Sequence, residues 1–205
     1  IHQWKQPLNR LMLLISNLED SILSGEEDEV TVLELSGEAK ETVRLLSDTI
    51  TEFRSVLAHD GCNSFFSLEE AVQYVLNIFA TRIRENNILC EVRIEADLEI
   101  FGKKSILIQA IMNLVDNAVK ASKEGRKIWI RADERELSVR DEGKGIPLED
   151  LARVTEAFYM VDKARARSAG SVGLGLAICE EIAMLHGARL SLESEEGKGT
   201  CVHLF

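Results

Sequence analysis

The hydrophobic pattern of the chain changes type once, at residues 60–64. Before this point, apolar residues recur at the three- and four-residue spacing of amphipathic helices. After it, short apolar runs of strand length alternate with helical segments. This change predicts an all-helical segment over residues 1–60, followed by an α+β domain over residues 64–205.

The helical segment reads as two long helices joined by a loop. The apolar stripe of the first helix is Leu8, Leu11, Met12, Ile15 and Leu18, and that of the second is Val43, Leu46, Ile50, Phe53 and Leu57. An acidic turn at residues 25–29 separates them. A two-helix hairpin cannot bury both stripes by itself, so we expect it to pair with a second copy into a dimeric four-helix bundle.

The second segment predicts an α/β sandwich in which helices cover one face of a mixed sheet. Ser67 and Glu70 have the spacing of a capping box and predict a helix that runs to about Asn87. Further helices are expected at residues 103–122, 147–154 and 174–186. Strands are expected at residues 88–94, 127–132, 136–140, 188–193 and 200–205.

Composition excludes several classes of function. The net charge of −11 argues against general nucleic-acid binding, which needs a basic face, but leaves room for a nucleotide site. No apolar run approaches the roughly 18 residues that span a bilayer, so we expect no membrane segment in this part of the protein. The four cysteines show no metal-binding spacing and are expected to be free thiols in a reducing compartment.

Asn113, Asn117 and Lys120 lie at positions i, i+4 and i+7 of a predicted helix and share one face. An amide oxygen is a hard ligand suited to Mg²⁺, which completes its coordination with water and phosphate oxygens. Lys120 can meet phosphate charge. The alternative is a solvated helix face with incidental polar residues.

Asp141, Gly143 and Gly145 follow directly on a predicted strand. An ionised Asp141 can accept a hydrogen bond from the exocyclic amine of adenine, whereas guanine presents a carbonyl there. The pattern therefore favours ATP over GTP, with a simple turn as the alternative.

The segment Gly173-Leu174-Gly175-Leu176 stands just before a predicted helix, where free backbone N–H groups can bind phosphate oxygens. Lys163 and Arg165 in the preceding loop supply positive charge, unless they form only a solvated basic patch. A last glycine turn ends at Thr200, before the final strand.

In this order and spacing, these segments resemble the ATP-binding domain of the histidine kinase, Hsp90, gyrase and MutL superfamily, over about residues 64–205. The resemblance implies that Asn117 is the Mg²⁺ ligand, that Asn113 supports it, and that Phe158 anchors a lid over residues 159–172. Two positions depart from the kinase pattern. Met160 stands where a basic residue is common, and Ser171 stands at the first glycine position of the second glycine box.

Residues His2-Gln3-Trp4-Lys5-Gln6-Pro7-Leu8 resemble the H box of histidine kinases. Pro7 removes a backbone N–H and displaces a carbonyl inside the helix, which bends the helix beside His2. A neutral imidazole is a competent nucleophile at pH 7. Gln3 replaces the carboxylate that many of these kinases carry after the histidine, and Gln6 matches a position implied to orient water in dephosphorylation.

Together, the two resemblances imply a sensor histidine kinase core that moves the γ-phosphoryl group of ATP to His2 and then to an aspartate on a response-regulator receiver domain. We expect it in the cytoplasm, alone or as the cytosolic part of a membrane-bound sensor. Two alternatives stay open: a phosphatase-dominant regulatory scaffold that binds ATP, and an ATPase of the Hsp90 or MutL kind.

Overall fold

The computed structural model describes residues 5–24, 31–40, 42–43, 63–161 and 173–205. The chain separates into two units, Ile1–Ser55 and Val56–Phe205, which are treated one at a time. In the described parts of the chain, no helix combines the length and the hydrophobicity that a bilayer span requires.

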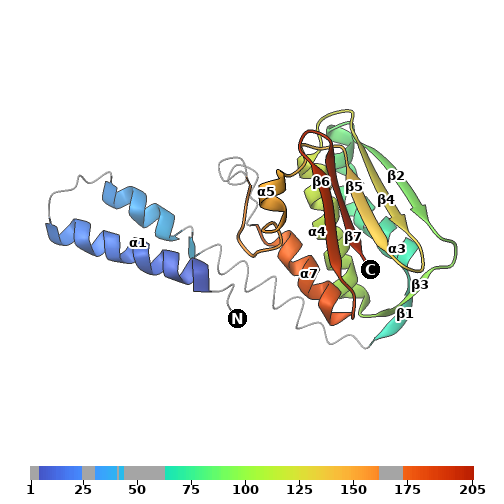
Figure 1. The fold of residues 1–205 in the computed structure, drawn as a ribbon, viewed down its shortest axis with the longest axis horizontal. Helices are drawn as coiled ribbons and strands as arrows, with labels where there is room; N and C mark the ends of the chain where they lie inside the picture. Colours follow the sequence, from blue (N-terminus) through green and yellow to red (C-terminus); the bar gives the residue numbers. More distant parts are fainter. Residues whose placement is uncertain (1–4, 25–30, 41, 44–62, 162–172) are drawn as a thin grey trace. The chain divides into compact units, whose positions relative to one another are not determined.

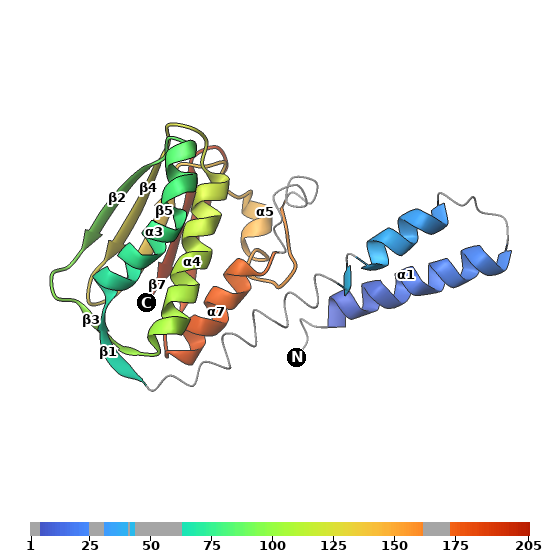
Figure 2. The ribbon, with the colours of Figure 1, turned by 180° about the vertical axis from the view of Figure 1, so that it is seen from behind.

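The first unit contains α1 (Lys5–Ser24) and a second helical stretch at residues 31–40, which lie side by side in Figures 1 and 2. Leu14 is buried, although it is outside the predicted stripe of α1. Met12 and Ile15, which belong to that stripe, are 70% and 44% exposed. One neighbouring helix covers only one side of α1, so this exposure in a single chain is consistent with the expectation that one hairpin cannot bury its own stripes.

The second predicted stripe lies outside the described residues, apart from Val43. The pairing of two hairpins into a bundle therefore stays a prediction.

The second unit contains a five-stranded sheet, drawn from β2 to β6 in Figure 1. Its strands, in spatial order, are β2 (Leu89–Ile94), β4 (Lys127–Ala132), β5 (Leu137–Asp141), β7 (Gly199–Leu204) and β6 (Leu190–Glu195). β2 runs parallel to β4, and all the other neighbours are antiparallel. The predicted mixed sheet is confirmed.

Three helices cover one face of this sheet, as Figure 2 shows from behind. They are α3 (Leu68–Glu85), α4 (Lys104–Ala121) and α7 (Gly175–Leu185). Fully buried aliphatic side chains fill the space between the two layers, among them Val72, Ile111, Val115, Ile128 and Ile182. Burial of these apolar faces is the main force that holds helices on a sheet, and it confirms the predicted α+β sandwich.

The start of α3 confirms half of the predicted capping box. The side chain of Ser67 accepts a hydrogen bond from the N–H of Glu70 at 3.3 Å, and Ser67 has the extended backbone of an N-cap. The carboxylate of Glu70 pairs instead with Lys104 of α4, at 3.3 Å.

Two strands were not predicted: β1 (Ser64–Ser67) and β3 (Glu99–Gly102), which form a separate antiparallel pair. Each is four residues long, too short to show a period of two. Ser64, expected at the domain boundary, pairs with Gly102 across 38 positions of sequence. The short α5 (Leu148–Leu151) ends earlier than residue 154, the end expected from the sequence.

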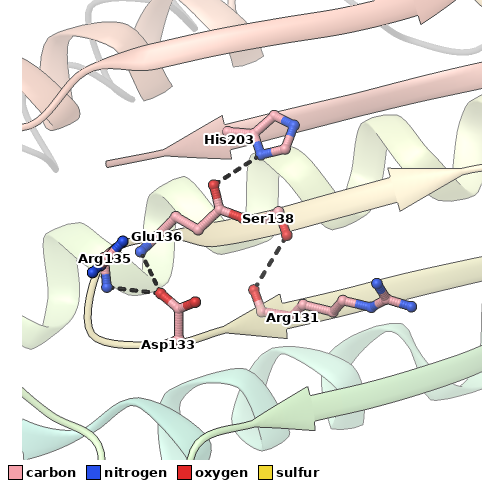
Figure 3. Close-up of polar contacts among 6 residues, drawn as sticks. All are labelled: Arg131, Asp133, Arg135, Glu136, Ser138 and His203. Carbon is pink, nitrogen blue, oxygen red and sulfur yellow. Dashed lines mark hydrogen bonds and ion pairs between the residues drawn. The ribbon is translucent and has the colours of Figure 1, made fainter.

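Polar contacts link β4, β5 and β7 near the β4–β5 turn (Figure 3): the Ser138 hydroxyl donates to the carbonyl of Arg131 at 3.5 Å, and His203 Nδ1 lies 3.2 Å from Glu136 Oε2. Asp133 Oδ1 accepts hydrogen bonds from the N–H groups of Arg135 and Glu136, at 2.7 and 3.0 Å. These bonds hold the pKa of Asp133 below its usual value and close the turn between β4 and β5. Turn geometry fixes the register of a hairpin. These hydrogen bonds therefore help to place Asp141, at the end of β5, opposite Ile128 of β4.

Candidate functional site

The end of β5 places a carboxylate in a buried position. Asp141 is the last residue of the strand and only 6% exposed, and its Oδ1 accepts a hydrogen bond from the Gly143 N–H at 2.7 Å. Burial raises the pKa of Asp141, and the N–H groups of Gly143 and Thr200 oppose the rise. A buried carboxylate with one oxygen oriented by the backbone can recognise a single amine donor.

The turn after Asp141 interlocks with the turn between β6 and β7. The Gly197 N–H donates to the carbonyl of Lys144 at 2.7 Å. Gly145 has a φ of +67°, and a Cβ there would lie 2.1 Å from the carbonyl oxygen of Glu195. Only glycine fits such a close backbone approach in this conformation.

Ser194 joins these two turns, although it was not among the residues predicted from the sequence. Its hydroxyl donates to the carbonyl of Gly199 at 2.9 Å, accepts from the Ile146 N–H at 2.8 Å and lies 2.8 Å from the hydroxyl of Thr200. The predicted nucleotide-binding residue Thr200 is therefore part of a network that holds the Asp141 turn. No local signal marks Ser194, because Ile146 is 48 residues away in sequence.

We expect Ser194→Ala to lower the free energy of unfolding by about 1–2 kcal/mol, because the partly buried Ile146 N–H would lose its acceptor. Ser191→Ala is the matched control on the same strand, where the serine is exposed. It should change the free energy by less than about 0.5 kcal/mol. Urea unfolding followed by circular dichroism measures both, and equal losses would contradict a bracing role for Ser194.

α4 and α7 bring the two asparagines against a glycine. A Cβ at Gly175 would lie 3.4 Å from Asn117 Nδ2 and 3.7 Å from Asn113 Cβ, so the start of α7 lies directly on this face of α4. Asn113 Nδ2 is buried and makes no conventional hydrogen bond among the described residues, although it lies near the buried thiol of Cys179, a weak acceptor whose pKa it lowers. An unpaired buried donor is costly, which marks this face as a place for a polar ligand or water.

The first turn of α7 has backbone N–H groups that can bind an anion. No side chain of the described residues caps it. Leu174 is buried and belongs to the core, and Leu176 packs against the core, so neither apolar side chain is free to contact a polar ligand. Their predicted contribution to phosphate binding therefore rests on their backbone N–H groups.

The two ends of the predicted lid meet. The Phe158 N–H donates to the carbonyl of Gly173 at 2.8 Å, and both residues have positive φ, 67° and 74°. A Cβ at Gly173 would lie 2.7 Å from the carbonyl oxygen of Tyr159, so this crossing requires glycine. Lys163, Arg165 and Ser171 lie outside the described residues, and their roles stay predictions.

Tyr159, the residue after Phe158, makes polar contacts that were likewise not predicted from the sequence. The hydroxyl of Tyr159 donates to Asp150 Oδ1, and this bond raises the pKa of Tyr159. The guanidinium of Arg153 lies over the Tyr159 ring, 4.2 Å from its centre. Asp150 and Arg153 thus hold Tyr159, the first residue of the predicted lid, in position.

Lys120 has an ion-pair partner on its own helix, and its predicted phosphate contact stays a prediction. Its ammonium group pairs with Asp116 Oδ2 at 2.7 Å, one turn back along α4. Of the H-box residues, His2 and Gln3 lie outside the described residues. Gln6 falls within α1. The structure therefore does not test the predicted phosphoacceptor group.

The residues around Asn117 fit a Mg²⁺ ion that arrives with phosphate better than a resident metal. Among the described residues, no group of three or more His, Cys, Asp or Glu side chains could hold a metal ion. An asparagine amide beside the open N-terminus of α7 provides one hard oxygen next to a place for phosphate oxygens.

Comparisons with known proteins agree with this geometry. The family profile described as histidine kinase-, DNA gyrase B-, and HSP90-like ATPase matches residues 102–205. Sensor histidine kinase WalK of Bacillus subtilis is 40% identical over 114 residues, which are 53% of this chain and 19% of WalK. Sensor-like histidine kinase SenX3 of Mycobacterium bovis is 30% identical over 208 residues, 97% of this chain and 50% of SenX3. The chain thus spans half or less of the length of these relatives.

A solved structure shares the fold of the second unit. The catalytic domain of histidine kinase ThkA superposes with a TM-score of 0.62 at 26% identity, covering 70% of this chain and 94% of that domain. The family match covers the Asp141 turn, the asparagine face of α4 and the start of α7. On these grounds the chain belongs to the family of histidine kinase-, DNA gyrase B- and HSP90-like ATPases, and its relatives there are two-component sensor histidine kinases.

Proposed function

We propose that this chain is the catalytic core of a sensor histidine kinase, which transfers the γ-phosphoryl group of ATP to its own His2. The observation that carries the proposal is the juxtaposition of Asn113 and Asn117 with the uncapped start of α7. Buried Asp141 supplies an acceptor for adenine in the same domain. The H-box sequence around His2 supplies a phosphoacceptor, which an ATPase of the Hsp90 or MutL kind does not need.

The reaction is a substitution at the γ-phosphorus. A ring nitrogen of neutral His2 forms the new bond, the bond to the β–γ bridging oxygen breaks, and ADP leaves. The proton on the other ring nitrogen passes to water, since Gln3 cannot accept it. Asp141 holds the adenine, and the N–H groups at the start of α7 hold phosphate oxygens. Mg²⁺, held by Asn117, would neutralise phosphate charge.

The exposed apolar residues of the first unit support a homodimer. Met12, Leu13, Ile22 and Leu33 are each more than 60% exposed in the single chain. Such positions on two neighbouring helices favour burial against a second copy in a four-helix bundle. We propose that this bundle presents phosphorylated His2 to an aspartate on a cytoplasmic response-regulator receiver domain, and that Gln6 assists the reverse dephosphorylation.

The test is to incubate the chain with Mg²⁺ and γ-labelled ATP and to follow the stability of any protein-bound label. A phosphohistidine gives label that acid removes and base does not. Acid-stable label, or steady release of phosphate with no labelled protein, would contradict the kinase assignment. ATP binding without any label would favour the phosphatase-dominant scaffold, the alternative that Gln3 and Ser171 keep open.

Gln3→Glu is expected to speed autophosphorylation by about tenfold or more, because a carboxylate can take the imidazole proton that water takes in the parent. The initial rate of labelling at saturating ATP measures the effect. Gln73→Glu is the matched control, because it makes the same substitution at an exposed position of α3, distant in sequence from the H box. An unchanged or lower rate in Gln3→Glu would show that proton removal does not limit the reaction.

A further inference from the structure

Three charged side chains form a bridge between α3 and α4 beside the asparagine face. Asp116 accepts from Arg82 of α3 through Oδ1 at 2.6 Å and from Lys120 of α4 through Oδ2 at 2.7 Å. The guanidinium of Arg82 also lies over the ring of Phe79, 5.5 Å from its centre, which restricts where it can go. One carboxylate is thus shared by two cations.

Asp116 and a bound phosphate would compete for Lys120. Asp116 directly precedes Asn117, and Lys120 lies one turn further along the same helix. In the structure the ammonium group is on the carboxylate. To meet a phosphate oxygen, as the proposed function requires, it has to leave Asp116 or share its charge.

We propose that Asp116 competes with nucleotide phosphate for Lys120, and that Arg82 weakens this competition, so that the three residues together set the affinity for ATP. The inference rests on the proposed function, since it concerns regulation of the same site. Asp116 and Arg82 act through Lys120 and are positioning residues.

The signs of the two effects are opposite. When Lys120 turns to phosphate, the carboxylate keeps Arg82 as its partner and is not left alone. Without Arg82, Lys120 is the one cation paired with Asp116 among the described residues, so the lysine is held more tightly and ATP affinity falls. Without the Asp116 charge, Lys120 loses this ion pair and ATP affinity rises. Partly exposed ion pairs of this kind change an equilibrium by about two- to fivefold.

The test measures binding of a non-hydrolysable ATP analogue with Mg²⁺ to the full chain by isothermal titration calorimetry. Asp116→Asn is expected to tighten binding by about threefold and Arg82→Gln to weaken it by about threefold. Glu70→Gln is the matched control, because Glu70 also joins α3 to α4, through Lys104 at 3.3 Å. It should leave the affinity unchanged.

A Lys120→Met background separates competition for the lysine from the general effect of charge. There, the effects of Asp116→Asn and Arg82→Gln should each fall below about 1.5-fold, because the shared partner is gone. Adenosine, which has no phosphate, should bind the parent and both single variants equally.

Effects of the same sign, or effects that persist in the Lys120→Met background, would overturn the inference. A change in adenosine affinity would do so too, since it would mean a structural role. If the parent chain binds no nucleotide at all, it is the proposed function that fails.

Discussion

Replacement of His2 by glutamine is expected to eliminate the acid-labile label that the chain acquires from γ-labelled ATP and Mg²⁺. Glutamine offers an amide nitrogen whose lone pair is delocalised, so it cannot attack phosphorus as a neutral imidazole does. ATP binding should persist, because the residues predicted to bind the nucleotide all lie at positions 113–200. Scintillation counting of acid- and base-treated protein gives the label, and calorimetry gives the affinity.

His59→Gln is the control for this experiment. It makes the same substitution at the other histidine of residues 1–60, outside the H-box sequence. This variant should keep the full label. Label retained on His2→Gln but lost on His59→Gln would move the phosphoacceptor to His59, and label retained on both would place it outside this segment.

Asp141→Asn is expected to weaken ATP binding by roughly 10- to 150-fold, the equivalent of about 1.5–3 kcal/mol for a hydrogen bond to a charged group. In the parent, one carboxylate oxygen accepts from the Gly143 N–H. In the proposed complex, the carboxylate also accepts from adenine. The asparagine has one acceptor oxygen, so its amide nitrogen meets one of these two donors. The preference for ATP over GTP should shrink as well, since an amide N–H can donate to the guanine carbonyl.

The pH dependence of binding gives a second readout for Asp141. Burial raises the pKa of its carboxyl group above the usual value. The ionised carboxylate is a stronger acceptor for the adenine amine than the protonated acid, so ATP affinity should be constant above this pKa and fall as the pH is lowered through it. The Asp141→Asn variant should lack this fall.

Asp133→Asn is the matched control, because Asp133 also accepts from backbone N–H groups but lies at the opposite end of the β4–β5 hairpin. It should leave ATP affinity within about twofold of the parent. Equal losses in both variants would indicate that Asp141 acts on the fold and not on adenine.

The features that could be predicted from the sequence are those whose physics is local. Ser67 caps α3 because its hydroxyl meets an N–H only three residues away. Asp141 lies at the end of a strand because glycines follow the apolar run there. The asparagines of α4 share a face because helical spacing alone fixes their direction. The family was visible in the order of such local motifs along the chain.

The tertiary structure decided everything that depends on partners distant in sequence. The pairing of β1 with β3, the bracing of Ile146 by Ser194, and the sharing of Asp116 between Arg82 and Lys120 join residues up to 48 positions apart. A short strand, a single serine or one arginine has no period to detect, and each becomes important only when packing of the apolar faces brings its partner within hydrogen-bond distance. The sequence thus determined which chemical groups the site contains. The packing of helices on the sheet determined which of these groups are positioned for a ligand and which, like Lys120, already pair with another side chain.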